Sequence, residues 1–138
     1  MTALSASRAQ VLACQRDRLR QVLAHAQARS AFWRARLAAA GVTPEHADVE
    51  DLQRLPVLTK GEVLAHWDEL SAVPGMTRAA AEAHLAALRD GRPDAGTAWT
   101  SPATGEQVMF FATGGSSGCR GLFAWDWDHL ANSGLAHF

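Results

Sequence analysis

The sequence contains few cysteines and no long apolar run. Its two cysteines, Cys14 and Cys119, lie far apart and form neither a disulfide framework nor a zinc-type pair. We therefore expect a protein of the reducing cytoplasm. No stretch approaches the roughly 18 consecutive apolar residues of a membrane span, and residues 1–10 lack the apolar core of a secretory signal. These absences predict a protein that has no membrane partner.

Charge of one sign is not in excess either. Lysine and arginine together number 13, and aspartate and glutamate number 14, so the formal net charge is −1. A nucleic-acid-binding domain usually carries a basic surplus or a basic face, so we expect no nucleic-acid partner. The chain is 48% hydrophobic and 20% charged, which is typical of a globular protein rather than a disordered one. Its 138 residues correspond to one domain or part of one.

The amino-terminal part of the chain predicts helices. Residues 7–28 carry apolar side chains at helical spacing, which places five of them on one face. These five are Leu12, Leu19, Val22, Leu23 and Ala26. Ser30 is expected to cap a second helix, and Gly41 to end it in the left-handed conformation that glycine tolerates. Residues 49–55 are expected to form a further helical turn before Pro56.

Capping signals continue further along the chain. Thr59 has the spacing of a capping box, and a short helix that reaches Trp67 or Leu70 should follow. An alanine-rich helix is predicted over residues 78–88, with the preceding threonine as its cap. Residues 91–104 are rich in glycine, proline and hydroxyl side chains, so we expect a loop there.

The pattern then changes to that of strands. Residues 108–112 are a continuous apolar run of strand length, and residues 122–125 are a second. The segment between them is rich in glycine and in hydroxyl side chains. We therefore expect a strand–loop–strand unit over residues 107–125. The chain divides into a helical lead-in, residues 1–98, and a phosphate-loop region, residues 99–138.

The end of the second region is expected to start a helix. Asp126 or Asp128 has the side chain and position to cap a helix that begins at His129. We assign no catalytic residue and no metal ligand anywhere in the chain. The six histidines are scattered, and no two of them have the spacing of a zinc-binding helix.

The loop between the two predicted strands carries the chemistry of a phosphate site. Glycines let backbone N–H groups converge on one concavity, and hydroxyl groups add short donors. An arginine at the rim adds positive charge. The candidate phosphate-binding residues are Thr113, Gly114, Gly115, Ser116, Ser117, Gly118 and Arg120.

Three known glycine-rich loop motifs can be compared with this segment, and two of them do not match it. A Walker A loop ends in Gly-Lys-Ser/Thr, whereas Gly118 is followed by Cys119 and Arg120. The dinucleotide fingerprint opens a helix, whereas a strand is predicted here. A nucleophile elbow, G-x-S-x-G, is formally present around Ser116 and leaves a serine hydrolase fragment as an alternative. A second alternative is a small helical interaction module whose glycine-rich hairpin binds no ligand.

Three segments, in order, resemble the adenylate-forming enzyme superfamily, and within it the phenylacetate–CoA ligase-like proteins. Residues 111–118, FATGGSSG, resemble the Ser/Thr/Gly-rich ATP loop of that superfamily. Residues 55–60, LPVLTK, are similar to the L-P-x-x-T-K element that precedes a helix in the ligase-like proteins. Residues 30–33, SAFW, follow a leading helix as in that family's opening pattern. The loop departs from the commoner S-S-G-T-T-G-K-P at its first pair, T-G, and at its last, C-R.

The resemblance implies an α/β fold, in which a mainly helical segment leads into a strand–loop–strand unit. It implies the incomplete N-terminal part of a larger adenylate-forming domain of an ATP-dependent acid–CoA ligase. The partners it implies are ATP, Mg²⁺, coenzyme A and a carboxylic acid, with the loop holding the ATP phosphates. The family's acid, adenine and catalytic-lysine regions would follow residue 138, so we expect the chain alone to be inactive. We also expect it to be marginally stable and to self-associate.

Overall fold

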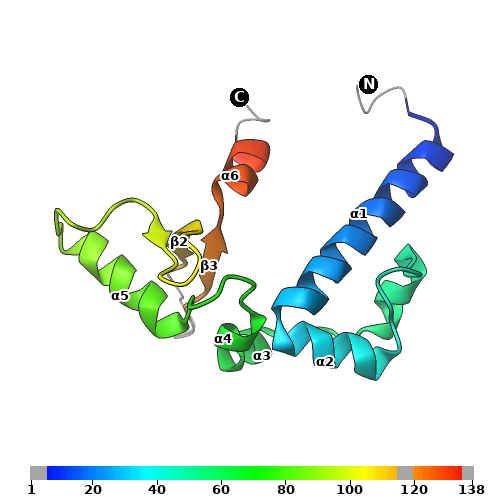
Figure 1. Ribbon diagram of the computed structural model, residues 1–138, viewed down its shortest axis with the longest axis horizontal. Helices are drawn as coiled ribbons and strands as arrows, with labels where there is room; N and C mark the ends of the chain where they lie inside the picture. Colours follow the sequence, from blue (N-terminus) through cyan, green and yellow to red (C-terminus); the bar gives the residue numbers. More distant parts are fainter. Residues whose placement is uncertain (1–5, 115–119, 135–138) are drawn as a thin grey trace. The chain divides into compact units, whose positions relative to one another are not determined.

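The computed structural model describes residues 6–114 and 120–134 (Figure 1). These residues form two compact units, divided in the sequence between Thr59 and Lys60. The division falls inside residues 1–98, for which the sequence predicts helices. Among the residues that the structure describes, no helix is both long enough and apolar enough to cross a membrane.

Local capping signals set the bounds of the helices in the first unit. Its elements are α1 (Arg8–Arg29), α2 (Ala31–Ala40) and the 3-10 helix η2 (Val49–Arg54). The side chain of Ser7 accepts a hydrogen bond from the backbone N–H of Gln10 at the start of α1. Ser30 ends α1 and also begins α2, where its hydroxyl accepts from the backbone N–H of Trp33. Gly41 ends α2 with φ 62°, the left-handed conformation predicted for it.

The hydrophobic core of the first unit is small. Its buried apolar residues are Leu23, Leu37, Val42 and Ala47. Leu23 confirms part of the predicted apolar face of α1. Leu12 and Val22 contradict another part, because they are 43% and 63% exposed. Leu19 and Leu23 both contact this core, so the covered side of α1 is narrower than the predicted face and leaves Val22 in solvent.

The second unit combines helices with a small sheet. Its elements are α3 (Lys60–Ala65), α4 (Trp67–Leu70), α5 (Arg78–Arg89), β1 (Trp99–Thr100), β2 (Gln107–Ala112), β3 (Leu122–Trp125) and α6 (Trp127–Gly134). The hydroxyl of Thr77 accepts from the backbone N–H of Ala80, which confirms the predicted cap of α5. Asp126 accepts from the backbone N–H of His129, and α6 begins at Trp127, two residues earlier than predicted.

The three strands form an antiparallel sheet in the order β1–β2–β3. The two predicted strands are confirmed as β2 and β3, with Phe110 opposite Ala124 and Ala112 opposite Leu122. β1 lies inside residues 91–104, where the prediction of a loop is therefore wrong at two residues. Two residues are too few to show a strand pattern in sequence, and only their pairing with β2 defines the strand.

The sheet of the second unit is covered on one face. The buried core consists of Trp67, Met76, Ala81, Val108, Phe110 and Leu122. Helix α5 packs against β2, and Trp67 Nε1 donates a hydrogen bond to the carbonyl of Leu122 at 3.3 Å. The opposite face carries exposed aromatic residues. This aromatic face consists of Phe111, Phe123 and Trp125. The fold is thus a mixed helix and sheet structure of the general α/β class.

Candidate phosphate-binding site

The predicted strand–loop–strand unit is a β-hairpin. β2 and β3 pair as antiparallel strands up to Ala112 and Leu122, and the glycine-rich segment connects them at this end. Three of the candidate residues are described and exposed, namely Thr113, Gly114 and Arg120. The other four lie outside the described residues, namely Gly115, Ser116, Ser117 and Gly118. The geometry of the site therefore comes from the two ends of the loop.

Thr113 and Gly121 close the hairpin one step beyond the last pair of strand residues. The backbone N–H of Thr113 donates to the carbonyl oxygen of Gly121 at 2.9 Å. The backbone N–H of Gly121 donates to Thr113 Oγ1, also at 2.9 Å. Because the hydroxyl oxygen is the acceptor in this bond, its hydrogen can still be donated to a ligand oxygen. Thr113, Gly114, Arg120 and Gly121 together form the hairpin mouth.

The two glycines of the hairpin mouth differ in the space around them. A Cβ atom at Gly121 would lie 3.1 Å from both Thr113 Oγ1 and Phe123 Cε2, a tight contact that these side chains would have to relieve by moving a few tenths of an ångström. A Cβ atom at Gly114 would meet no heavy atom of the described residues within 4 Å, so these residues leave the Gly114 backbone accessible to a ligand. Sequence reasoning missed Gly121, because its role depends on the contact with Thr113, eight residues away.

Arg120 lies beside a carboxylate that the sequence does not predict. Its Nη1 is 3.2 Å from Oε2 of Glu82, which belongs to α5. The two side chains are 47% and 37% exposed, so solvent screens the ion pair. The residues are 38 positions apart, and the packing of α5 against β2 brings them together. No local motif in the sequence signals this contact.

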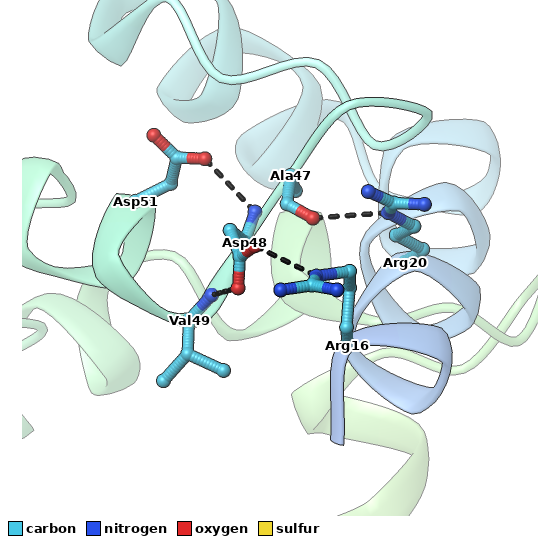
Figure 2. Close-up of polar contacts among 6 residues, drawn as sticks. All are labelled: Arg16, Arg20, Ala47, Asp48, Val49 and Asp51. Atoms are coloured by element: carbon cyan, nitrogen blue, oxygen red, sulfur yellow. Dashed lines mark hydrogen bonds and ion pairs between the residues drawn. The ribbon is translucent and has the colours of Figure 1, made fainter. Parts of the chain in front are cut away.

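A cluster of charged residues in the first unit has a structural role (Figure 2). Arg16 Nε donates to Asp48 Oδ2 at 2.7 Å, and Arg20 Nε donates to the carbonyl of Ala47 at 3.0 Å. The backbone N–H of Val49 and the Arg16 guanidinium lower the pKa of Asp48 below its ordinary value. These groups bond to one another, so the cluster fastens the start of η2 to α1.

Two further features bear on the chemistry of the chain, namely metal ligands and a nucleophilic serine. Within residues 6–114 and 120–134, no three histidine, cysteine, aspartate or glutamate side chains gather in a way that could hold a metal ion. A nucleophile elbow requires a helix directly after the loop. The described residues that follow the loop lead instead into β3. Ser116 lies outside the described residues, so the serine hydrolase alternative stays a prediction.

Comparison with protein-family models and with curated proteins identifies no family for this chain. No protein-family model matches the chain, and a search of curated proteins finds no matching relative. The resemblance to adenylate-forming enzymes therefore rests on the three sequence segments and on their order along the chain.

Proposed function

We propose that this chain is the N-terminal, phosphate-binding part of an ATP-dependent acid–CoA ligase similar to phenylacetate–CoA ligase. The observation that carries the proposal is the hairpin mouth, where Thr113 with its hydroxyl group, Gly114 and the basic residue Arg120 flank the loop at one end of an antiparallel hairpin. The agreement of three sequence segments with that family supports it. A cytoplasmic location is part of the proposal, because the two cysteines form no disulfide framework.

The donor groups of the hairpin mouth suit a polyphosphate. The Thr113 hydroxyl hydrogen can be donated to a phosphate oxygen, and the backbone at Gly114 leaves room for close approach. Arg120 has five N–H donors, of which one is used in the contact with Glu82, and the others can bind phosphate oxygens. Magnesium would bind through the phosphates themselves, as is common at nucleotide sites, and would neutralise part of their charge.

The proposed reaction has two steps. A carboxylate oxygen attacks the α-phosphorus of ATP and pyrophosphate leaves, which gives an acyl-adenylate. The thiol of coenzyme A then attacks the acyl carbon, AMP leaves, and the thiol proton passes to solvent. A carboxylate is already ionised at neutral pH, so the first step needs no general base. The hairpin mouth would hold the β and γ phosphates and stabilise the charge of the departing pyrophosphate.

Binding of ATP and of tripolyphosphate to the full chain tests the proposal. Arg120→Gln and Thr113→Val should each weaken binding about fivefold, because each removes a donor to phosphate oxygens. Arg92→Gln is a matched control, since Arg92 is also an exposed arginine in an ion pair, with Asp94. Thr104→Val is the matched control for the threonine, since Thr104 lies in the turn between β1 and β2. Equal losses in the controls, or no binding by the wild type, would contradict the proposal.

One observation favours the interaction-module alternative. The residues of the aromatic face, Phe111, Phe123 and Trp125, are 40%, 51% and 36% exposed. Exposed apolar patches often mark protein interaction sites. A pure interaction module would bind a protein partner through this face and would bind neither ATP nor tripolyphosphate. The same binding experiment therefore separates the two functions.

A further inference from the structure

Glu82 places a negative charge beside the hairpin mouth. Its Oε2 lies 3.2 Å from Nη1 of Arg120, the residue that follows the loop. The backbone is held at both ends of this ion pair. Ala81, next to Glu82, is completely buried in the core of the second unit. Gly121, next to Arg120, bonds to Thr113 through both its N–H and its carbonyl. The two charges therefore lie close together because of the fold.

We propose that Glu82 limits the affinity of the hairpin mouth for polyphosphate by competing for Arg120. This inference rests on the proposed function and adds a residue to it. In the ion pair, the carboxylate neutralises the positive charge that an incoming phosphate would meet, and it also repels that phosphate. A polyphosphate must therefore share or displace the contact between Arg120 and Glu82.

Glu82 has two opposing effects on anion binding, and repulsion is the larger. The ion pair restrains the Arg120 side chain, and this loss of freedom before binding favours binding. An exposed pair with a single N–O contact, however, restrains an arginine only weakly. The repulsion acts on every charge of the ligand, so it grows with the charge of the polyphosphate. Because both side chains are partly exposed, salt screens the repulsion.

A limited affinity suits the proposed reaction. Pyrophosphate has to leave after the first step, and an uncompensated Arg120 would hold it. Glu82 lies within contact distance of Arg120, so the ion pair re-forms as the product departs. Glu82 is thus a positioning residue that acts through Arg120.

Calorimetric binding of tripolyphosphate and of ATP to the full chain, at low and high salt, tests the inference. Glu82→Gln should tighten the binding of both about three- to tenfold at low salt, and high salt should reduce the difference. Glu82→Asp keeps the charge and should bind within about twofold of the wild type. Asp90→Asn is the matched control, because it removes a carboxylate about 12 Å further along the helix axis. At high salt its affinity should stay within about twofold of the wild type, and at low salt it should change by less than that of Glu82→Gln, because the removed charge is more distant.

A double variant shows whether Glu82 acts through Arg120. In an Arg120→Gln background only the direct repulsion between Glu82 and the anion remains, so Glu82→Gln should tighten binding clearly less than it does in the wild-type background. Equal tightening in both backgrounds, or weaker binding by Glu82→Gln alone, would overturn the inference and leave the proposed function standing. If neither the wild type nor Glu82→Gln binds either anion, the inference and the proposed function are both wrong. Thermal melting checks the fold of each variant, and Glu82→Ala provides a second neutral substitution with the same expected result.

Discussion

The Asp48 carboxylate and the Arg16 guanidinium form an ion pair that joins the start of η2 to α1, with Oδ2 and Nε 2.7 Å apart. Asp48 Oδ1 also accepts a hydrogen bond from the backbone N–H of Val49. Asp51 accepts a hydrogen bond from the backbone N–H of Asp48. Backbone N–H donors contribute most to the lowered pKa of both aspartates, and arginine side chains contribute next. The ionised carboxylates therefore help to hold η2 in place.

We predict that the first unit loses stability in acid. The pKa of Asp48 and of Asp51 is lower in the folded chain than its ordinary value of 3.8. Their stabilising effect is complete above the unfolded pKa and is lost as the pH falls through the folded values, so the loss begins below about pH 4. Asp48→Asn should lower Tm at neutral pH and flatten its dependence on pH. Circular dichroism melts measure both, and Asp17→Asn, at an exposed aspartate of α1, controls for the loss of one charge. An unchanged pH dependence in Asp48→Asn would contradict this prediction.

Gly121→Ala should destabilise the hairpin mouth, whereas Gly114→Ala should not. A methyl group at position 121 would lie 3.1 Å from Thr113 Oγ1, and moving this oxygen away would lengthen and weaken its hydrogen bond from the Gly121 N–H. We expect a loss of about 1–2 kcal/mol in the free energy of unfolding. A methyl group at position 114 meets no heavy atom of the described residues within 4 Å, so we expect a change within about 0.5 kcal/mol. Urea unfolding compares the variants, and equal stability would show that closure does not depend on Gly121.

His84 offers a substitution that should stabilise the second unit. Among the described residues, its buried Nε2 has no hydrogen-bond partner, and its ring lies edge-on to Phe110 with the centroids 5.9 Å apart. His84→Leu keeps an apolar contact and removes the unsatisfied nitrogen, so the free energy of unfolding should rise by about 1 kcal/mol. His46→Leu, at an exposed histidine of the first unit, is the control and should change it by less than about 0.5 kcal/mol. A destabilised His84→Leu would show that the nitrogen is satisfied in solution.

The isolated chain should self-associate through its aromatic face. Phe123 pairs with Phe111 and is 51% exposed, on a strand at one edge of the sheet, and exposed edges and apolar patches favour association. Phe123→Ser should therefore shift the sedimentation coefficient toward that of a monomer. Val57→Ser is the control, since Val57 is 84% exposed in the first unit. A wild-type chain that stays monomeric at all concentrations is the result that would contradict this expectation.

The isolated chain should not catalyse carboxylate-dependent exchange of pyrophosphate into ATP. The resemblance assigns the acid, adenine and catalytic-lysine regions to later parts of the family's sequence. The assay uses labelled pyrophosphate, Mg²⁺, ATP and a series of aromatic and aliphatic carboxylates. Tripolyphosphate binding in the same buffer shows that the hairpin mouth is intact. Exchange that disappears in Arg120→Gln would show that these 138 residues contain a working active site.

Much of the local structure follows from residues that are close together in the chain. Ser30 and Thr77 act on backbone N–H groups three residues away, and Gly41 acts through its own backbone conformation. These positions can therefore be predicted from side-chain chemistry alone. The strands β2 and β3 are continuous apolar runs on either side of a glycine-rich segment, so the hairpin and its rim residues Thr113 and Arg120 could be predicted as well.

Packing between segments that are distant in the sequence determined the remaining strand, the pattern of burial on α1 and the ion pair of Arg120. The strand β1 exists because it pairs with β2. Val22 is exposed although its neighbour Leu23 is buried, because the packed segments cover one side of α1 and not the side that carries Val22. Glu82 meets Arg120 across 38 residues because α5 packs against the sheet. A cap or a turn depends on bonds within a few residues, whereas burial and ion pairing depend on which distant segments meet. Local sequence patterns carry the first kind of information and not the second.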